Sequence, residues 1–195
     1  EAARDANTKR LEKLKSAYFE KNAEAISMHA ILVLRRIAYP SVFPRDIDAI
    51  YDPESKIIVI DHPLPDLDSI PIFKEKKSRS PFGVADLAPI TSAERRQITD
   101  DVLYMILLRT LRDVALSDDL NVLNAIAVNG RMVYKDKATG QQRNEYLMSV
   151  LATAEQIRNI DFNNVDPKTC FKALKGISSA KPSQCVPVAP IITFN

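Results

Sequence analysis

The spacing of apolar positions at the start of the chain predicts helix. Residues 4–38 carry apolar side chains at helical intervals among Lys and Glu, which indicates one long helix, or two helices that join near Asn22. The early part has the sparse apolar stripe of a helix that emerges from a coiled coil, and the later part is apolar enough to be buried. Pro40 ends the pattern. We therefore divide the chain into a long N-terminal helix, residues 1–38, which could continue an upstream coiled coil, and a domain of residues 39–195.

Two later regions show the pattern of β-hairpins. Residues 46–51 and 56–61 flank the turn 52–55, in which Pro53 presets a turn dihedral, and the second of these runs is rich in β-branched side chains. Residues 121–136 and 144–152 flank a turn in which Gly140 can take a positive φ. Each pair predicts two antiparallel strands.

The remaining pattern predicts helices and one long loop. Thr91 and Glu94 form a capping-box sequence ahead of a helix that is apolar almost all round in its middle, which indicates a central core helix. Short helices are expected to begin at Thr153 and, with Asp166 as cap and Pro167 in the first turn, at 166–176. The apolar positions of residues 63–89 follow neither a helical nor a strand period, which indicates a loop. The predicted fold class is α+β: an antiparallel sheet of the two hairpins packed against the central helix, with the long N-terminal helix and short C-terminal helices.

Composition narrows the class of protein without indicating a function. The 195 residues are 46% hydrophobic and 27% charged, with a formal net charge of +2, which is typical of a compact globular domain and excludes a disordered, collagen-like or disulfide-stapled chain. Cys170 and Cys185 lack metal-site spacing and indicate reduced thiols. The chain has neither a signal peptide nor a long apolar run, so we expect a cytoplasmic location and no membrane partner. It begins in helical register without Met, as a piece of a longer protein would.

Charge is distributed unevenly along the chain. Residues 45–68 hold two basic and seven acidic side chains, which makes the first hairpin a poor face for phosphates, whereas residues 130–143 hold four basic side chains and one acidic. Basic clusters of this kind are usually solvated surface, and phosphate contact is the alternative. The candidates for DNA phosphate contact are Lys74, Lys76, Lys77, Arg79, Arg131, Lys135, Lys137, Arg143, Lys172 and Lys175.

One pattern resembles a nuclease site. Pro65-Asp66 followed by Glu75-Lys76-Lys77 spells the PD…ExK arrangement, in which two carboxylates bind Mg²⁺ and a Lys lies beside the attacking water. That geometry comes from adjacent strands, and here both halves fall in a proline-interrupted segment, so we favour an ordinary loop.

The other reactive side chains are also interpreted as structural. His29 and His62 have no partner at metal-ligand spacing, and Cys170 has no identifiable base. We therefore predict no catalytic residue, no metal site and no cofactor in this chain.

Four stretches together resemble the region that precedes the catalytic domain in bacterial restriction endonucleases of the Mrr-like type. They are Ala38-Tyr39-Pro40 with Phe43 and the hairpin that ends in Pro63-Leu64-Pro65; Leu107-Leu108-Arg109-Thr110-Leu111; Asn129-Gly130 leading to the run from Tyr134 to Gly140; and the run from Asp166 to Gly176. The resemblance covers about residues 18–190 and includes no catalytic signature.

This resemblance implies an accessory part of a bacterial defence enzyme. In such proteins a nuclease domain, for which Mg²⁺ is expected, follows the region seen here, and a helical or coiled-coil segment precedes it. The resemblance implies a non-catalytic DNA-binding or regulatory domain of a restriction endonuclease, with double-stranded DNA as partner. The alternative is a protein–protein or oligomerisation module that self-associates through the N-terminal helix and positions a neighbouring nuclease domain.

Overall fold

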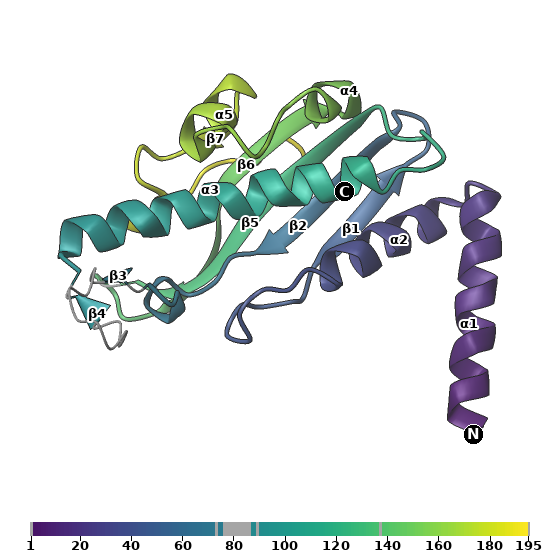
Figure 1. The fold of residues 1–195 in the computed structure, drawn as a ribbon, viewed down its shortest axis with the longest axis horizontal. Coiled ribbons are helices and arrows are strands. Elements are labelled where there is room, and N and C mark those ends of the chain that lie inside the picture. The colour runs from purple at the N-terminus through teal and green to yellow at the C-terminus, as the bar shows by residue number, and fades with distance from the viewer. Residues whose placement is uncertain (1, 73, 76–86, 89, 137, 195) are drawn as a thin grey trace, which may run out of the picture.

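A computed structural model gives the fold of residues 2–72, 74–75, 87–88, 90–136 and 138–194, with side chains described for 8–72, 90–136 and 138–194. The N-terminal region consists of two helices, α1 (Ala2–Phe19) and α2 (Ala23–Arg35), so the second of the two sequence alternatives holds. Asn22 separates them because its side chain accepts a hydrogen bond from the Ala25 amide at 3.1 Å and caps α2. Helix α1 packs mainly on α2 and extends away from the body of the molecule (Figure 1).

A mixed sheet of five strands forms the centre of the molecule (Figure 1). Both predicted hairpins are present as antiparallel pairs, β1 with β2 and β5 with β6. Strands β2 and β5 run parallel, with Ile58 opposite Ile126. The strands, in sheet order, are β1 (Asp48–Asp52), β2 (Ile57–Pro63), β5 (Ala125–Lys135), β6 (Gln142–Thr153) and β7 (Ile177–Ser178).

The predicted antiparallel sheet of two hairpins is therefore wrong, although the α+β class is correct. Helix α3 (Ser92–Leu116) crosses over between β2 and β5, and a strand that follows such a crossover enters the sheet parallel to the strand before it. The longest helix is this central one, with 25 residues, and not the N-terminal helix. Strand β7 was also not predicted; it pairs with β6 at Met148 and Ser149.

Helix ends follow the predicted caps. The Thr91 hydroxyl accepts from the Glu94 amide at 3.2 Å, and the Glu94 carboxylate accepts from the Thr91 amide at 3.0 Å. Thr153 caps α4 (Ala154–Arg158), and Asp166 caps α5 (Pro167–Ala173), so both short helices begin where the sequence predicts. The predicted loop 63–89 contains the 3₁₀ turn η1 (Leu67–Ser69) and the short strands β3 (Lys74–Glu75) and β4 (Leu87–Ala88), and a second 3₁₀ turn, η2, spans Pro182–Gln184.

The two faces of the sheet are covered differently. Helices α2 and α3 pack on one face, where Ile58, Ile60 and Ile126 are fully buried. Residues 186–194 contact the other face. There the backbone amide of Ile191 donates to Ser149 Oγ at 2.9 Å, and the side-chain Nδ2 of Asn129 donates to the Ile192 carbonyl at 2.8 Å.

Three buried polar side chains form a row beneath this C-terminal segment. Asn129 Nδ2 donates to Asp61 at 3.0 Å, and Ser149 Oγ donates to Asn129 Oδ1 at 2.8 Å. The Tyr146 hydroxyl also donates to Asp61. This polar row of Asp61, Asn129 and Ser149 satisfies its own hydrogen bonds while it holds the segment on the sheet.

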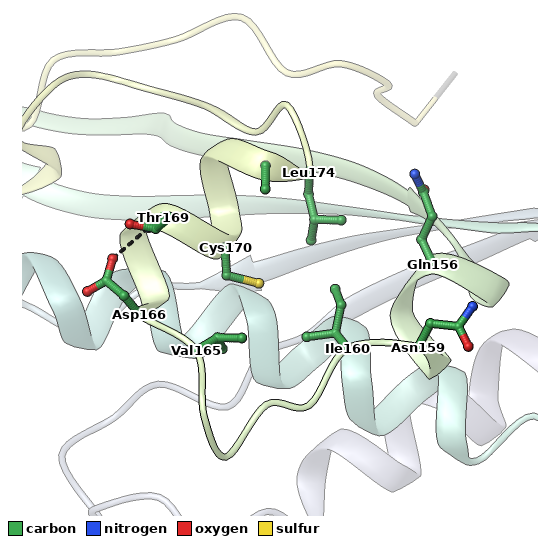
Figure 2. Close-up of a pocket in the computed structure, with 9 residues that line it drawn as sticks. Gln156, Asn159, Ile160, Val165, Asp166, Thr169, Cys170 and Leu174 are labelled. Atoms are coloured by element: carbon green, nitrogen blue, oxygen red, sulfur yellow. Dashed lines mark hydrogen bonds between the residues drawn. The ribbon is translucent and has the colours of Figure 1, made fainter.

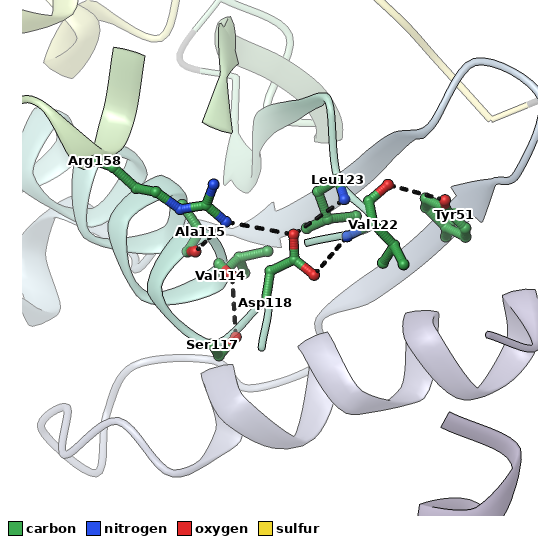
Figure 3. A network of polar contacts seen from close by, with 8 residues as sticks. All are labelled: Tyr51, Val114, Ala115, Ser117, Asp118, Val122, Leu123 and Arg158. Atoms are coloured by element: carbon green, nitrogen blue, oxygen red, sulfur yellow. Dashed lines mark hydrogen bonds and ion pairs between the residues drawn. The ribbon is translucent and has the colours of Figure 1, made fainter. Parts of the chain in front are cut away.

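A second polar network fixes the exit from α3 (Figure 3). The buried Asp118 carboxylate accepts from the amides of Val122 and Leu123 at 3.1 and 3.0 Å, and Arg158 of α4 lies 3.5 Å away. The Tyr51 hydroxyl donates to the Val122 carbonyl at 3.1 Å. The connection into β5 is thereby tied to α3, α4 and β1.

Candidate nucleic-acid interface

For half of the basic residues predicted to contact phosphate, the side chain lies outside the described part of the structure. Lys76, Lys77, Arg79 and Lys137 lie outside the described residues. Lys74 is on β3, and its side chain also lies outside the described part.

The described basic residues of the second hairpin have different environments. Lys135 is exposed, whereas Arg143 lies 3.7 Å from Asp136. Arg131 has a buried Nε that finds no hydrogen-bond partner among the described atoms, and its charge acts on Tyr146, whose pKa is raised to about 12 mainly by burial and by its hydrogen bond to Asp61. Arg131 is therefore half-buried on the sheet near Tyr146, which makes it a weaker candidate for phosphate contact than the exposed Lys135.

Lys172 and Lys175 are exposed and lie elsewhere, on α5 and just after it. Strand β7, which follows them, pairs with β6 at Met148. Lys135 of the second hairpin is opposite Gln142, six residues before Met148 on β6. At about 3.3 Å per residue this separation is roughly 20 Å. The described candidates from the sequence therefore do not form one basic patch.

Most of the PD…ExK pattern lies outside the described side chains. Asp66 is exposed ahead of η1, the side chain of Glu75 is outside the described part, and Lys77 is not described. In the described parts of the chain, no group of three or more His, Cys, Asp or Glu side chains could hold a metal ion.

Both histidines pack against tyrosine rings. The His29 ring lies 4.4 Å from that of Tyr18, and burial lowers the pKa of His29. His62 meets the Tyr39 ring edge-on at 6.2 Å, and burial lowers the pKa of His62 to about 4. Burial thus favours the neutral form of both imidazoles.

A groove of about 750 Å³ lies along the outer face of α3. One wall is the connection from α2 to β1, and the other is the connection from α4 to α5. We call this feature the Tyr39 groove. It is lined by Tyr39, Phe43, Val102, Met105, Ile106, Leu108, Arg109, Arg112, Phe162, Asn163, Val165 and Pro167.

Three planar groups are stacked in the wall of the Tyr39 groove. The rings of Phe43 and Tyr39 are stacked with centroids 5.7 Å apart and an interplanar angle of 22°. The guanidinium carbon of Arg109 lies 5.3 Å from the Tyr39 centroid, a cation–π distance. Phe43 is buried, and the Arg109 side chain is 42% exposed, so the stack is anchored in the protein and Arg109 remains accessible to solvent.

The charges around the groove are predominantly positive. Asp113 lies between two arginines, with Arg112 Nη2 at 2.7 Å and Arg109 Nε at 3.5 Å. A third arginine, Arg45, donates to the Tyr39 carbonyl at 3.3 Å. One carboxylate thus orients two guanidinium groups without neutralising both, and Arg45 adds a further positive charge.

The two carboxylates of strand β1 point away from the groove. On β1, Ala49 and Tyr51 are buried in the helix-covered core, and Asp48 and Asp52 alternate with them. Alternate strand residues face opposite sides, so these carboxylates lie on the other face of the sheet. The negative charge of Asp48 and Asp52 is therefore separated from the arginines.

A second hollow of about 620 Å³ lies between α4 and α5 (Figure 2). Ile160, Val165 and Leu174 give it apolar walls, and the Cys170 thiol points into it. Burial raises the pKa of Cys170, so the thiol is not activated as a nucleophile. Asp166, the charged residue of the lining, accepts from the Thr169 amide as the cap of α5, so this pocket offers mainly apolar contact.

Sequence reasoning did not select the groove residues as a site. Tyr39, Phe43 and Arg109 lie within the stretches that resemble the restriction endonucleases, but the resemblance assigns no role to them. The available signal was an arginine within the apolar run of α3. Its partners come from connections distant in sequence, so the spacing could not reveal them.

In the described parts of the chain, no helix is both long and apolar enough to span a membrane. No protein-family model, curated protein or solved structure matches this chain.

Proposed function

We propose that this chain is a non-catalytic DNA-binding module of a restriction-type endonuclease, and that the Tyr39 groove is its DNA contact. The observation that carries the proposal is that Arg109 and Arg112 line an aromatic groove, while Arg45 is bound to the backbone of Tyr39 in its wall. Arginine forks bind phosphate oxygens, and aromatic faces bind bases, so the two together suit nucleic acid. The sequence resemblance supports a restriction-type parent, in which a nuclease domain would follow this region.

In this proposal the arginines attract the phosphates of DNA, and the aromatic rings determine where on the surface the DNA binds. Asp113 holds two guanidinium groups in fixed directions, which reduces the conformational entropy lost when phosphate binds. The acidic strand β1 presents its carboxylates on the opposite face, so a DNA strand at the groove avoids them.

Salt dependence tests the proposal. We expect fluorescence anisotropy to show binding of labelled DNA that weakens between about 50 and 200 mM salt, with a slope of log K against log salt of about −2 to −3, because two to three phosphates are neutralised. Arg112→Ala, which removes one arginine available for a phosphate, should weaken binding and reduce that slope by about 1. The matched control Lys172→Ala, on α5, should retain the wild-type slope. Absence of binding at low salt, or binding that ignores salt, contradicts the proposal.

A second candidate, self-association through α1, is favoured by one observation. Leu11 and Phe19 on this helix are 51% and 59% exposed, and the helix packs mainly on α2. Apolar side chains on a projecting helix are suited to pairing with a second copy. Such pairing would bring two nuclease domains to a defined spacing.

A further inference from the structure

The shape of the Tyr39 groove distinguishes between forms of DNA. A duplex presents a convex backbone with its bases stacked inside, whereas a concave, aromatic-lined groove has room for a base only where that base is unpaired. We propose, on the basis of the proposed function, that the groove accepts an unpaired base of a DNA strand, stacked on the guanidinium of Arg109, with the flanking phosphates at Arg45 and Arg112.

The stack in the wall defines where the base lies. Tyr39 contacts both Phe43 and Arg109, the Arg109 side chain is 42% exposed, and guanidinium planes are known stacking surfaces for bases. Met105, which is 47% exposed on α3, and the half-buried Phe162 provide apolar surface at the sides of the groove. A base on Arg109 would therefore contact planar and apolar surface on more than one side.

The two remaining arginines approach this position from different elements, Arg112 from α3 and Arg45 from the connection between α2 and β1. Arg112 follows Arg109 by about one turn of α3, and Arg45 is bound to the Tyr39 carbonyl on the opposite wall. A strand whose base occupies the groove can present phosphates to both. An acidic helix could satisfy the same charges, but it presents no planar group to the guanidinium of Arg109, so the stacked geometry favours a base.

The test compares a single strand, a bulged duplex and a blunt duplex of similar length with wild-type protein at one salt concentration. We expect a single-stranded thymidine oligonucleotide, and a duplex with a one-nucleotide bulge, to bind about tenfold more tightly than a blunt duplex, which is the size of one stacking contact. Arg109→Lys keeps the positive charge and removes the planar group, so it should abolish most of this preference, measured as the ratio of the two affinities in the variant itself. Arg96→Lys, on the same helix near its start, is the matched control and should retain the preference.

Each contrary result has a distinct meaning. Duplex binding without preference for an unpaired base overturns this inference and leaves the proposed function intact, whereas absence of binding to every DNA form overturns both. A preference that survives Arg109→Lys overturns the stacking site. Binding of free deoxynucleotides with no binding of oligonucleotides, or displacement of the oligonucleotide by a poly-glutamate peptide at equal charge, also overturns the inference in favour of a small-molecule or acidic-protein site.

Discussion

At the scale of single residues, Tyr39 connects the groove to the core. Its ring stacks on Phe43, bears the Arg109 guanidinium and meets His62 edge-on, while burial raises the pKa of Tyr39 to about 12. The hydroxyl therefore stays protonated at physiological pH and does not add negative charge beside the arginines. No local sequence pattern could predict this cluster, because its members come from three separate segments.

His62 should make the stability of the protein depend on pH. Its folded pKa of about 4 is below the unfolded value of 6.5, because burial disfavours the charged imidazole. The unfolded state binds the proton more readily, so stability is complete above pH 6.5 and is lost as the pH falls toward 4. Urea unfolding should show a loss of about 2 kcal/mol between pH 6.5 and 5 from this residue.

The variant His62→Gln isolates that effect. It removes the titrating group, so its free energy of unfolding should fall less over the same pH interval than that of the wild type. Equal pH dependence in the two proteins would show that the imidazole of His62 is accessible to protons in the folded state.

At the scale of elements, local chemistry predicted the pieces better than their assembly. The Thr91–Glu94 capping box, the turn at Gly140 with its φ of 69° and both hairpins follow from nearby residues. The parallel pairing of β2 with β5 depends on a crossover through α3 and on burial of both strands, which local patterns do not specify. The sequence analysis therefore predicted the hairpins and missed the order that joins them.

Asp118 should be essential for the connection between α3 and β5. Asp118→Ala leaves two buried amides, those of Val122 and Leu123, without an acceptor and Arg158 without its ion pair, so we expect a loss of about 2–4 kcal/mol in the free energy of unfolding. The exposed neighbour Asp119 is the control, and Asp119→Ala should cost less than about 0.5 kcal/mol. Similar losses in urea unfolding for both variants would contradict this role of Asp118.

Ser149 should hold the C-terminal segment on the sheet. Ser149→Ala removes the acceptor of the Ile191 amide and one partner of Asn129, which should cost about 1–2 kcal/mol and increase hydrogen exchange at Ile191. Ser69→Ala, near the surface, should leave that exchange rate at its wild-type value. An unchanged Ile191 amide in Ser149→Ala would mean that the segment is held by its apolar side chains alone.

At the scale of the whole molecule, charge and shape are asymmetric. The arginines of the Tyr39 groove lie on the helix-covered side, and the carboxylates of β1 face the other side of the sheet. The sequence analysis anticipated an uneven distribution of charge and assigned the DNA contacts to basic residues of 74–79, which lie outside the described side chains, of the second hairpin and of the α5 region. The described residues there do not converge, because the hairpin extends the sheet in one direction while α5 packs against α3.

Self-association is a property of the whole chain and can be tested directly. If α1 pairs with a second copy, multi-angle light scattering should give a concentration-dependent mass above 21.8 kDa, and Leu11→Glu combined with Phe19→Glu should return the protein to a monomer. The charge-reversal control Lys13→Glu, on the same helix, should keep the wild-type mass. A wild-type monomer at all concentrations would contradict this second candidate.

Hydrogen–deuterium exchange with and without a single-stranded oligonucleotide tests the central claim, that the Tyr39 groove is the DNA contact, most directly. DNA should slow exchange in residues 39–46, which form one wall, and in the connection 160–166, which forms the other, and the protection should disappear in Arg109→Ala. Protection confined to the tip of the β5–β6 hairpin or to the residues around Lys172 and Lys175, with these two connections unchanged, would contradict the claim.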